Sequence, residues 1–409
     1  MSPTQTAVIA EEKKVYTLQF WLLCASTFLF FGSFNMIIPE LPNYLTSLGG
    51  ADYKGLIISL FTVTAGLSRP FSGKLADTVG RIPVLMTGLI VSFLCLLVYP
   101  FIASIAAFFL LRLFHGFSTG FAPTGASSVI ADIIPSHRRG EAMGVFGLCT
   151  SVGMALGTYL GGEIAILTSV KTMFYISAFI AFLSVVLAFT IKESLSDKVP
   201  FTPSLLKIPK NEFIETNVWL PSLVLMCYIF SYGAVITTSP DMSIFLGIEN
   251  KGIYFSFSVM ASLMVRIVAG KVSDIHGRSP VMKFSLSLLA IAMLLYGFSE
   301  NVYTFFTSAI LFGLGVGFSS PTVTAWVVDL SHANAKGKAM ATMFIALELG
   351  IGLGAFLGGE IHNNKVENFP WVGIMAMSVL IVGLIFLFVF GRKHDIIRNL
   401  KKQSRKSLN

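Results

Sequence analysis

Long apolar runs separated by short polar segments fill most of the 409-residue chain. Each run is close to the roughly 20 residues that an α-helix needs to cross a lipid bilayer. The pattern therefore predicts an all-α membrane protein with twelve transmembrane helices. We place them at residues 17–39, 54–76, 83–100, 104–131, 140–165, 171–191, 218–239, 252–273, 280–298, 303–330, 337–361 and 369–391.

Composition supports this fold class. Apolar residues make up 54% of the chain and charged residues 12%, whereas a soluble domain has about 25% charged residues. No cleavable signal peptide is expected, because the polar start leads into a full-length span without a small-residue cleavage site. The four cysteines fall inside apolar spans and lack zinc-ligand spacing, so we predict no disulfide framework, metal or cofactor.

A charged segment occurs twice, at an offset of 197 residues, which is close to half of the chain. Residues Gly73-Lys-Leu-Ala-Asp77-Thr-Val-Gly80-Arg81 recur as Gly270-Lys-Val-Ser-Asp274-Ile-His-Gly277-Arg278. The same offset pairs Asp132 with Asp329, and it pairs many glycines for which we expect a helix-packing role. The chain is therefore a duplicated membrane unit, and such units usually surround a pathway. The packing glycines are Gly116, Gly120, Gly153, Gly157, Gly161, Gly162, Gly350 and Gly354.

The distribution of basic residues predicts the orientation. Lys and Arg outside the spans or in their end turns number 22 on the side of the termini and even-numbered loops, and four on the other side. The positive-inside rule then places both termini in the cytoplasm. We divide the chain into an N-tail (1–16), an N-terminal six-helix bundle (17–192), a cytoplasmic linker (193–217), a C-terminal bundle (218–391) and a basic C-tail (392–409). A lipid-facing role of this C-tail is favoured over binding of nucleic acid.

The repeated loop has clear physical requirements. Gly73 allows two helices to approach closely, and Gly80 allows the tight turn between them. An unpaired carboxylate at Asp77, near the membrane surface, is costly, so it needs a cation or a helix N-terminus. Arg69 and Arg266 lie one turn before the loop glycines, and we expect both to reach the cytoplasmic interface.

These motifs resemble the major facilitator superfamily over nearly the whole chain. The two loops resemble its motif between helices two and three and the echo between helices eight and nine. Arg112-x-x-x-Gly116 resembles the fourth-helix motif, and Gly153 to Gly162 resembles the fifth-helix motif of the antiporter subgroup. That subgroup normally has Pro after the second glycine, where this chain has Thr158.

The resemblance implies two pseudo-symmetric six-helix bundles that work by alternating access in a plasma membrane, which for bacteria is the inner membrane. It implies that Asp77 contacts the opposite half and latches the outward-open state, with Arg81 and Asp132 completing a charge relay. The second-half counterparts are Asp274, Arg278 and Asp329. The alternative is that these charges only set the topology.

Two charged residues lie within predicted spans without a like partner in the other half. Arg112 is about 13 Å from the outer end of its span at 1.5 Å per residue, and its partner by offset is Ala309. An intramembrane charge is a functional hypothesis by default. Arg112 either binds an anionic substrate, repels a proton from a nearby carboxylate, or forms a buried structural ion pair.

Glu348 lies near the middle of the eleventh span, and its partner by offset is Ser151. Burial favours the neutral form of a carboxyl, as a proton carrier requires. Glu348 is therefore either a proton carrier or a side chain hydrogen-bonded to a neighbouring helix.

The first span ends Asn35-Met-Ile-Ile-Pro39, which resembles drug-efflux members, many of which carry an acidic residue near the place of Asn35. Asn35, Tyr228, Tyr232 and Trp326 lie on helices that line the cavity in this family. Each is open to either a substrate contact or a packing role.

We interpret the chain as a monomeric secondary transporter of a small organic solute, most consistent with proton-coupled efflux. Import or uniport of sugar-like or organic-anion solutes is the alternative within the class. A polytopic membrane enzyme is the rival class. Gly116-Phe-Ser118-Thr-Gly120 matches a hydrolase motif, but it lies inside a span rather than on a strand-to-helix turn, and an enzyme has no need to duplicate a charged loop. No ATP-binding loop motif is present.

Overall fold

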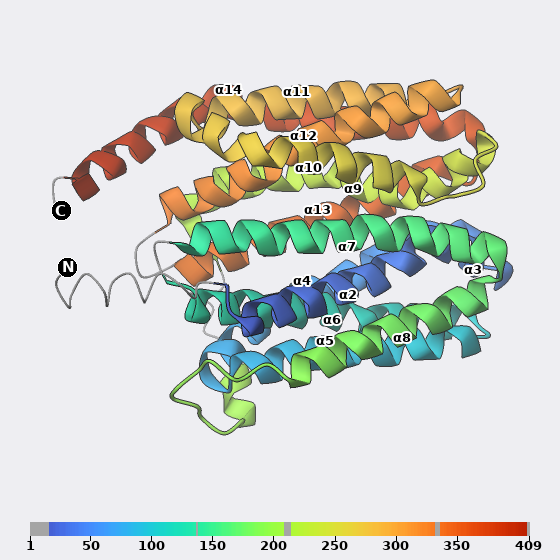
Figure 1. Ribbon diagram of the computed structural model, residues 1–409. Coiled ribbons are helices and arrows are strands. Elements are labelled where there is room, and N and C mark those ends of the chain that lie inside the picture. Colours follow the sequence, from blue (N-terminus) through green and yellow to red (C-terminus); the bar gives the residue numbers. More distant parts are fainter. Residues whose placement is uncertain (1–15, 136–137, 208–213, 332–335, 407–409) are drawn as a thin grey trace, which may run out of the picture.

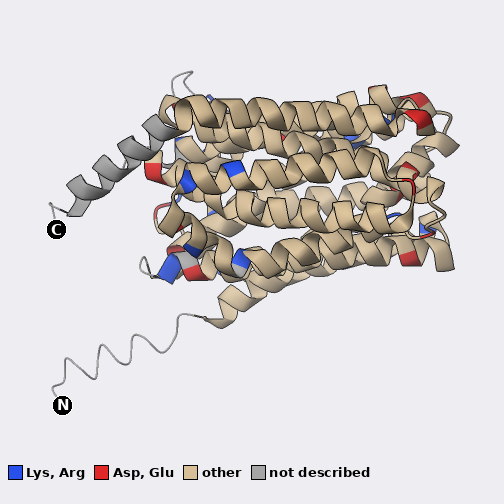
Figure 2. Cartoon of the chain, turned by 90° about the horizontal axis from the view of Figure 1, so that it is seen from above, with Lys and Arg blue, Asp and Glu red and all other residues tan. Residues whose placement is uncertain are grey.

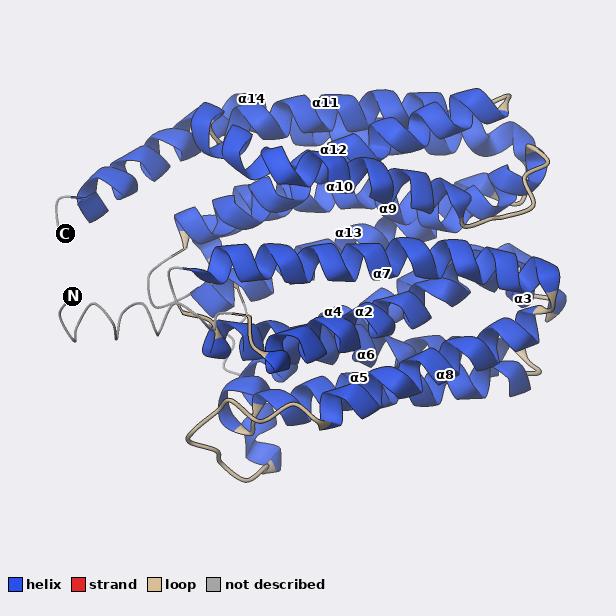
Figure 3. Ribbon diagram, in the orientation of Figure 1, coloured by secondary structure: helices blue, strands red, loops and turns tan. Residues whose placement is uncertain are grey.

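The protein is represented by a computed structural model that describes residues 16–135, 138–207, 214–331 and 336–406. Nearly all of the predicted N-tail (1–16), part of the linker and residues 407–409 lie outside these ranges. Within them the chain is helical, with loops between the helices and no strand in the described part (Figure 3).

Twelve described helices have 18 residues or more. The first six are α2 (Leu18–Ile37), α4 (Lys54–Thr78), α5 (Arg81–Val98), α6 (Ile105–Ile133), α7 (Arg139–Leu167) and α8 (Val170–Phe189). The second six are α9 (Trp219–Phe245), α10 (Ile253–His276), α11 (Arg278–Gly297), α12 (Val302–Leu330), α13 (Lys336–His362) and α14 (Phe369–Lys406). Short pieces, including η2 (Ile38–Glu40), α3 (Leu41–Ser47), η3 (Ala51–Tyr53) and η9 (Val366–Asn368), lie at the ends of these helices.

Ten of the described helices are long and apolar enough to cross a membrane. An eleventh is α10, if its two parts, bent by 55° between Arg266 and Val268, count as one span. The predicted twelve spans thus correspond to twelve long helices, of which α4 is too polar to meet this criterion.

Local sequence explains where the matched helices start. Ser104 accepts a hydrogen bond from the Ala107 N–H and caps α6, and Asn301, which is 197 residues later, does the same for α12 from the Thr304 N–H. Such side chains satisfy backbone N–H groups that the first helical turn leaves unpaired. Gly80 and Gly277 precede α5 and α11 with φ of 145° and 96°, a region that favours glycine.

The helices form two groups. Helices α2 and α4–α8 pack with one another, as do α9–α14, and the groups meet where α4 packs on α13 and α7 packs on α10. Figure 1 shows the first group below the second, with the helices running side by side. We call the two groups the N-bundle and the C-bundle.

The two ends of the bundles carry different charged residues, and we call them the motif end and the far end. The motif end carries the loops at Gly73–Arg81 and Gly270–Arg278, and there α2 begins and α14 ends (Figure 1). The far end carries Glu40, Lys54 and Asp241. Charged residues gather near both ends and leave a long, mostly uncharged middle (Figure 2), as the apolar spans require.

Candidate functional site

The two repeated loops form the same charge cluster in each bundle. In the N-bundle, Arg81 pairs with Asp77, and its Nε donates to Asp132 Oδ2 at 3.1 Å. In the C-bundle, Arg278 pairs with Asp274 at 2.8 Å and with Asp329 at 3.1 Å. Each arginine thus joins the helix before the loop to the fourth helix of its own bundle.

The loop carboxylates are open to solvent on their other side. The Asp77 side chain is 72% exposed and that of Asp274 is 61% exposed. A methyl group placed on Gly73 or Gly270 would meet no described heavy atom within 4 Å. Among the described residues no hydrogen bond or ion pair joins Asp77 to the opposite bundle, so the latch that the family resemblance implies is not seen within them.

Glu193, which follows α8, completes the first loop. Its carboxylate accepts hydrogen bonds from the N–H groups of Arg81 and Ile82 at 3.0 and 3.1 Å, and from those of Ser194 and Leu195. Burial alone would raise the pKa of Glu193, but these four N–H groups hold its pKa below the ordinary value of 4.5. Sequence reasoning missed this contact, which spans 112 residues.

Two lysines form ion pairs that link the bundles at the far end. Lys54 Nζ lies 2.7 Å from Asp241 of α9, and Lys251 Nζ lies 2.6 Å from the buried Glu40. His362 Nε2 lies 3.2 Å from the same Asp241 oxygen. Each lysine belongs to one bundle and its carboxylate to the other. The signal in the sequence is the offset of 197 residues between Lys54 and Lys251, although the sequence does not show which carboxylates they meet.

The middle of the interface carries two arginines, and the expectation that they reach the membrane surface is wrong. Arg69 Nη2 lies 3.0 Å from Glu348 Oε1, with side-chain exposures of 9% and 6%, and its guanidinium stacks on Phe344. Arg266 Nη1 donates to Ser151 Oγ at 2.9 Å. Each arginine side chain thus contacts a polar side chain of the opposing bundle.

Arg112 is fully buried inside the N-bundle. Its Nε donates to the Ile57 carbonyl at 2.7 Å, its Nη1 donates to the Tyr99 hydroxyl at 3.1 Å, and the group lies over the Phe61 ring. Among the described residues no carboxylate forms an ion pair with it, so the ion-pair interpretation does not apply to this conformation. Arg112 links α6 to the backbone of α4.

A small cavity of about 30 Å³ lies between the bundles, lined by Asn35 and Tyr232 among others, with Thr158 of α7. The Asn35 side chain donates to a carbonyl of its own helix. Tyr228 and Trp326 are buried in the main apolar core instead. Of the four residues expected at the cavity, the structure brings Asn35 and Tyr232 together there.

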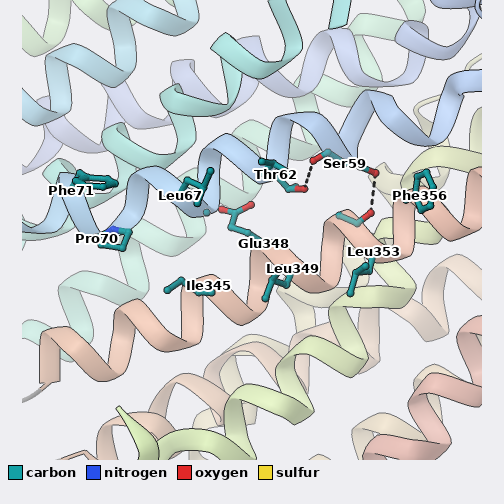
Figure 4. Close-up of a pocket in the computed structure, with 13 residues that line it drawn as sticks. Ser59, Thr62, Leu67, Pro70, Phe71, Ile345, Glu348, Leu349, Leu353 and Phe356 are labelled. Carbon is teal, nitrogen blue, oxygen red and sulfur yellow. Dashed lines mark hydrogen bonds between the residues drawn. The ribbon is translucent and has the colours of Figure 1, made fainter. Parts of the chain in front are cut away.

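A larger groove of about 620 Å³ runs between α4 and α13 (Figure 4). Glu348 points from α13 toward α4 in the middle of it, and Ser59 donates to the Gly352 carbonyl across the interface at 2.9 Å. Its rim is apolar and exposed, with Leu67 at 65% and Leu349 at 53%. The groove thus leads from the outer surface of the bundles to the Arg69–Glu348 pair.

Glycines explain how closely the helices approach. A methyl group on Gly153, Gly157 or Gly161 of α7 would collide with backbone oxygens of α2. Gly350 and Gly354 of α13 face the backbone of α9 in the same way. Gly116, Gly120 and Gly162 have comparably close neighbours.

Two duplicated helical bundles around buried charges have the architecture of an alternating-access membrane transporter. The family model described as Major Facilitator Superfamily matches residues 23–266 and 221–408. The chain therefore belongs to the major facilitator superfamily, whose members are transporters rather than enzymes.

Known proteins are similar over nearly the whole chain. The staphylopine export protein of Staphylococcus aureus is 25% identical over 374 residues, covering 89% of this chain and 94% of that one. The multi-drug resistance efflux pump PmrA of Streptococcus pneumoniae is 26% identical over 377 residues, covering 88% and 92%. The crystal structure of a D-xylose–proton symporter matches with a TM-score of 0.74 at 16% identity, covering 91% and 97%, which shows the shared fold.

Proposed function

We propose that this transporter exports a small organic solute from the cytoplasm in exchange for protons, with the motif end and both termini in the cytoplasm. Export is supported by the names of the relatives, which include an export protein and efflux pumps. The orientation is supported by the 22 basic residues at the motif end against four at the far end.

The observation that carries the proposal is the buried pair between Arg69 and Glu348, which joins the two bundles in the middle of the interface. An ionised Glu348 is paired with Arg69. A proton on Glu348 removes the charge, releases the guanidinium and weakens this link between α4 and α13. Protonation of one carboxyl thus biases how the bundles pack, as coupling requires.

The conformation corresponds to the stage after proton release. In the proposed orientation the Lys54–Asp241 and Lys251–Glu40 pairs close the extracellular end, and at the cytoplasmic end no described ion pair joins Asp77 or Asp274 to the opposite bundle. Solute then binds from the cytoplasm. The far-end pairs separate in the outward-facing state, in which Asp77 would contact the C-bundle.

The proposal is tested in two steps. A strain lacking the gene is first screened for sensitivity across a panel of solutes, with and without a protonophore, to find an exported compound. Purified wild-type protein and Glu348→Gln are then compared in proteoliposomes with an imposed pH gradient and that compound.

Because Gln mimics the protonated carboxyl, Glu348→Gln should retain downhill exchange of the solute but lose accumulation against its gradient. If this variant still accumulates the solute in response to the pH gradient, the proton travels elsewhere. Uptake into cells that requires the wild-type protein would instead favour the importer or uniporter alternative.

A further inference from the structure

The two arginines at the middle of the interface occupy matched positions with different chemistry. Arg69 and Arg266 are 197 residues apart, as are Ser151 and Glu348. In the structure Arg69 contacts Glu348 and Arg266 contacts Ser151, so the duplication has placed both pairs in the same geometry. Between α4 and α13 the charge of Arg69 is neutralised by Glu348. Between α7 and α10 Arg266 contacts only the uncharged hydroxyl of Ser151 among the described polar side chains.

Arg266 is therefore an excess positive charge between the bundles. The described ion pairs that cross the interface match Lys54 with Asp241, Lys251 with Glu40 and Arg69 with Glu348. Arg266 has none among the described residues, and its Nε is buried without a hydrogen-bond partner. Arginine stays charged in proteins, and a charge inside the membrane is unfavourable unless something pairs with it.

Arg266 lies between the small cavity lined by Asn35 and Tyr232 and the motif end. Tyr228 lies four residues before the cavity residue Tyr232 on α9, and Ser151 lies seven residues before Thr158 on α7. Arg266 lies seven residues after Val259 on α10. Such spacings keep residues on one helix face, so Ser151 and Arg266 lie on the same faces of α7 and α10 as the cavity residues, nearer to the motif end, where Tyr228 of α9 is part of the buried core.

The residues of α7 that face Arg266 are small. A methyl group on Gly147 of α7 would lie 3.9 Å from Arg266 Nη1 and touch nothing closer. Ser151 offers a small hydroxyl beside the guanidinium. The Nε and Nη groups of an arginine form the planar fork that binds carboxylates with two parallel hydrogen bonds, and here only Nη1 has a hydrogen-bond partner among the described residues, the Ser151 hydroxyl.

We propose that Arg266, with Ser151 beside it, binds a carboxylate group of the transported solute, so the solute is an organic acid in its anionic form. This inference rests on the proposed function in taking the central cavity as the solute site. The apolar body of the solute then lies toward Tyr232 and Phe255, and the carboxylate supplies the charge that Glu348 supplies to Arg69.

The test is equilibrium binding of 1-naphthoate and its neutral isostere 1-naphthamide to the purified full chain, measured by calorimetry without a pH gradient. The wild type should bind naphthoate at least about tenfold more tightly than naphthamide, because one charge-assisted contact is lost with the amide. Arg266→Gln should abolish this preference, and Arg266→Lys, which retains the charge, should preserve most of it.

Ser151→Glu is the decisive variant, because it copies the arrangement of Arg69 and Glu348 onto the other side. The new carboxylate should pair with Arg266, remove naphthoate binding and leave the thermal unfolding midpoint no lower than that of the wild type. Thermal unfolding of every variant verifies that it is folded.

The inference is overturned if the wild type does not prefer naphthoate, or if folded Arg266→Gln or Ser151→Glu retains the preference. These outcomes are independent of proton coupling, since no gradient is applied. Conversely, a Glu348→Gln protein that still accumulates solute would refute the proposed coupling without affecting carboxylate binding at Arg266.

Discussion

At the residue scale, the buried charges differ in what would follow from losing one partner. Arg69 and Glu348 are both nearly inaccessible, so removing either one leaves the other as an unpaired charge or an unsatisfied group in an apolar medium. Arg112 is bound by a carbonyl, a hydroxyl and an aromatic ring, which disperse its charge without neutralising it. Loss of one partner therefore leaves an unpaired charge at the first arrangement, whereas Arg112 has no carboxylate partner among the described residues to lose.

We predict that Arg69→Gln destabilises the protein by about 3 kcal/mol, the range for breaking a buried pair from one side. The double variant Arg69→Gln/Glu348→Gln should recover most of this loss, because two neutral amides replace the pair. The wild type, Arg69→Gln, Glu348→Gln and the double variant form a double-mutant cycle, whose stabilities are measured by thermal unfolding in detergent. Additive losses in the double variant would show that the two side chains are not coupled.

At the scale of elements, the repeated loop explains both what sequence could predict and what it could not. The repeat of Gly80 and Arg81 as Gly277 and Arg278 predicted two matching turns. In the structure both glycines have positive φ, and both arginines pair with an aspartate of the fourth helix of their bundle. Glu193 was not predictable in this way. Its contact with the start of α5 depends on how α8 packs, and the sequence offers no periodic or repeated signal for it.

We predict that Glu193→Gln destabilises the protein by roughly 1 kcal/mol at neutral pH, the size of a lost charge at a helix N-terminus. The pKa of Glu193 is lower in the folded state than its ordinary value of 4.5. Its contribution is therefore complete above pH 4.5 and disappears as the pH falls through the folded-state pKa.

The measurement is the thermal unfolding midpoint of the wild type and Glu193→Gln between pH 3.5 and pH 7. The gap between them should be constant near neutrality and shrink in acid. Glu300→Gln, which changes an exposed carboxylate at the far end, is the control and should show no gap. A gap that is independent of pH would assign Glu193 a packing role only.

At the scale of the whole molecule, the duplication predicted two bundles, the order of their helices and the positions of the repeated loops. It did not predict which matched residues would face each other across the interface, because that depends on which alternating-access conformation the bundles adopt. Arg69 shows the difference: its position one turn before a loop glycine predicts a side chain at the membrane surface, whereas in the structure it is buried against Glu348 of the opposing bundle. Lys54 and Lys251 lie 197 residues apart, but only the docked bundles place Asp241 and Glu40 within their reach.

The far-end ion pairs should set the balance between the two conformations of the transporter. Both join one bundle to the other, so each must break before the far end opens. Loss of about 1.4 kcal/mol of interaction changes the ratio of two states tenfold. We therefore predict that Lys54→Gln/Lys251→Gln populates a far-end-open conformation that is rare in the wild type.

The measurement is the distance between spin labels on cysteines introduced at Ser47 and Glu367, which are exposed at the far end of the N-bundle and C-bundle. Pulsed electron resonance should give a single short distance for the wild type and an added longer one for the double variant. Lys171→Gln is the matched control, since Lys171 is exposed and forms no ion pair with any described residue. If the double variant keeps the wild-type distance, packing of Gly55 and Gly359 rather than charge closes this end, because their backbones already meet there.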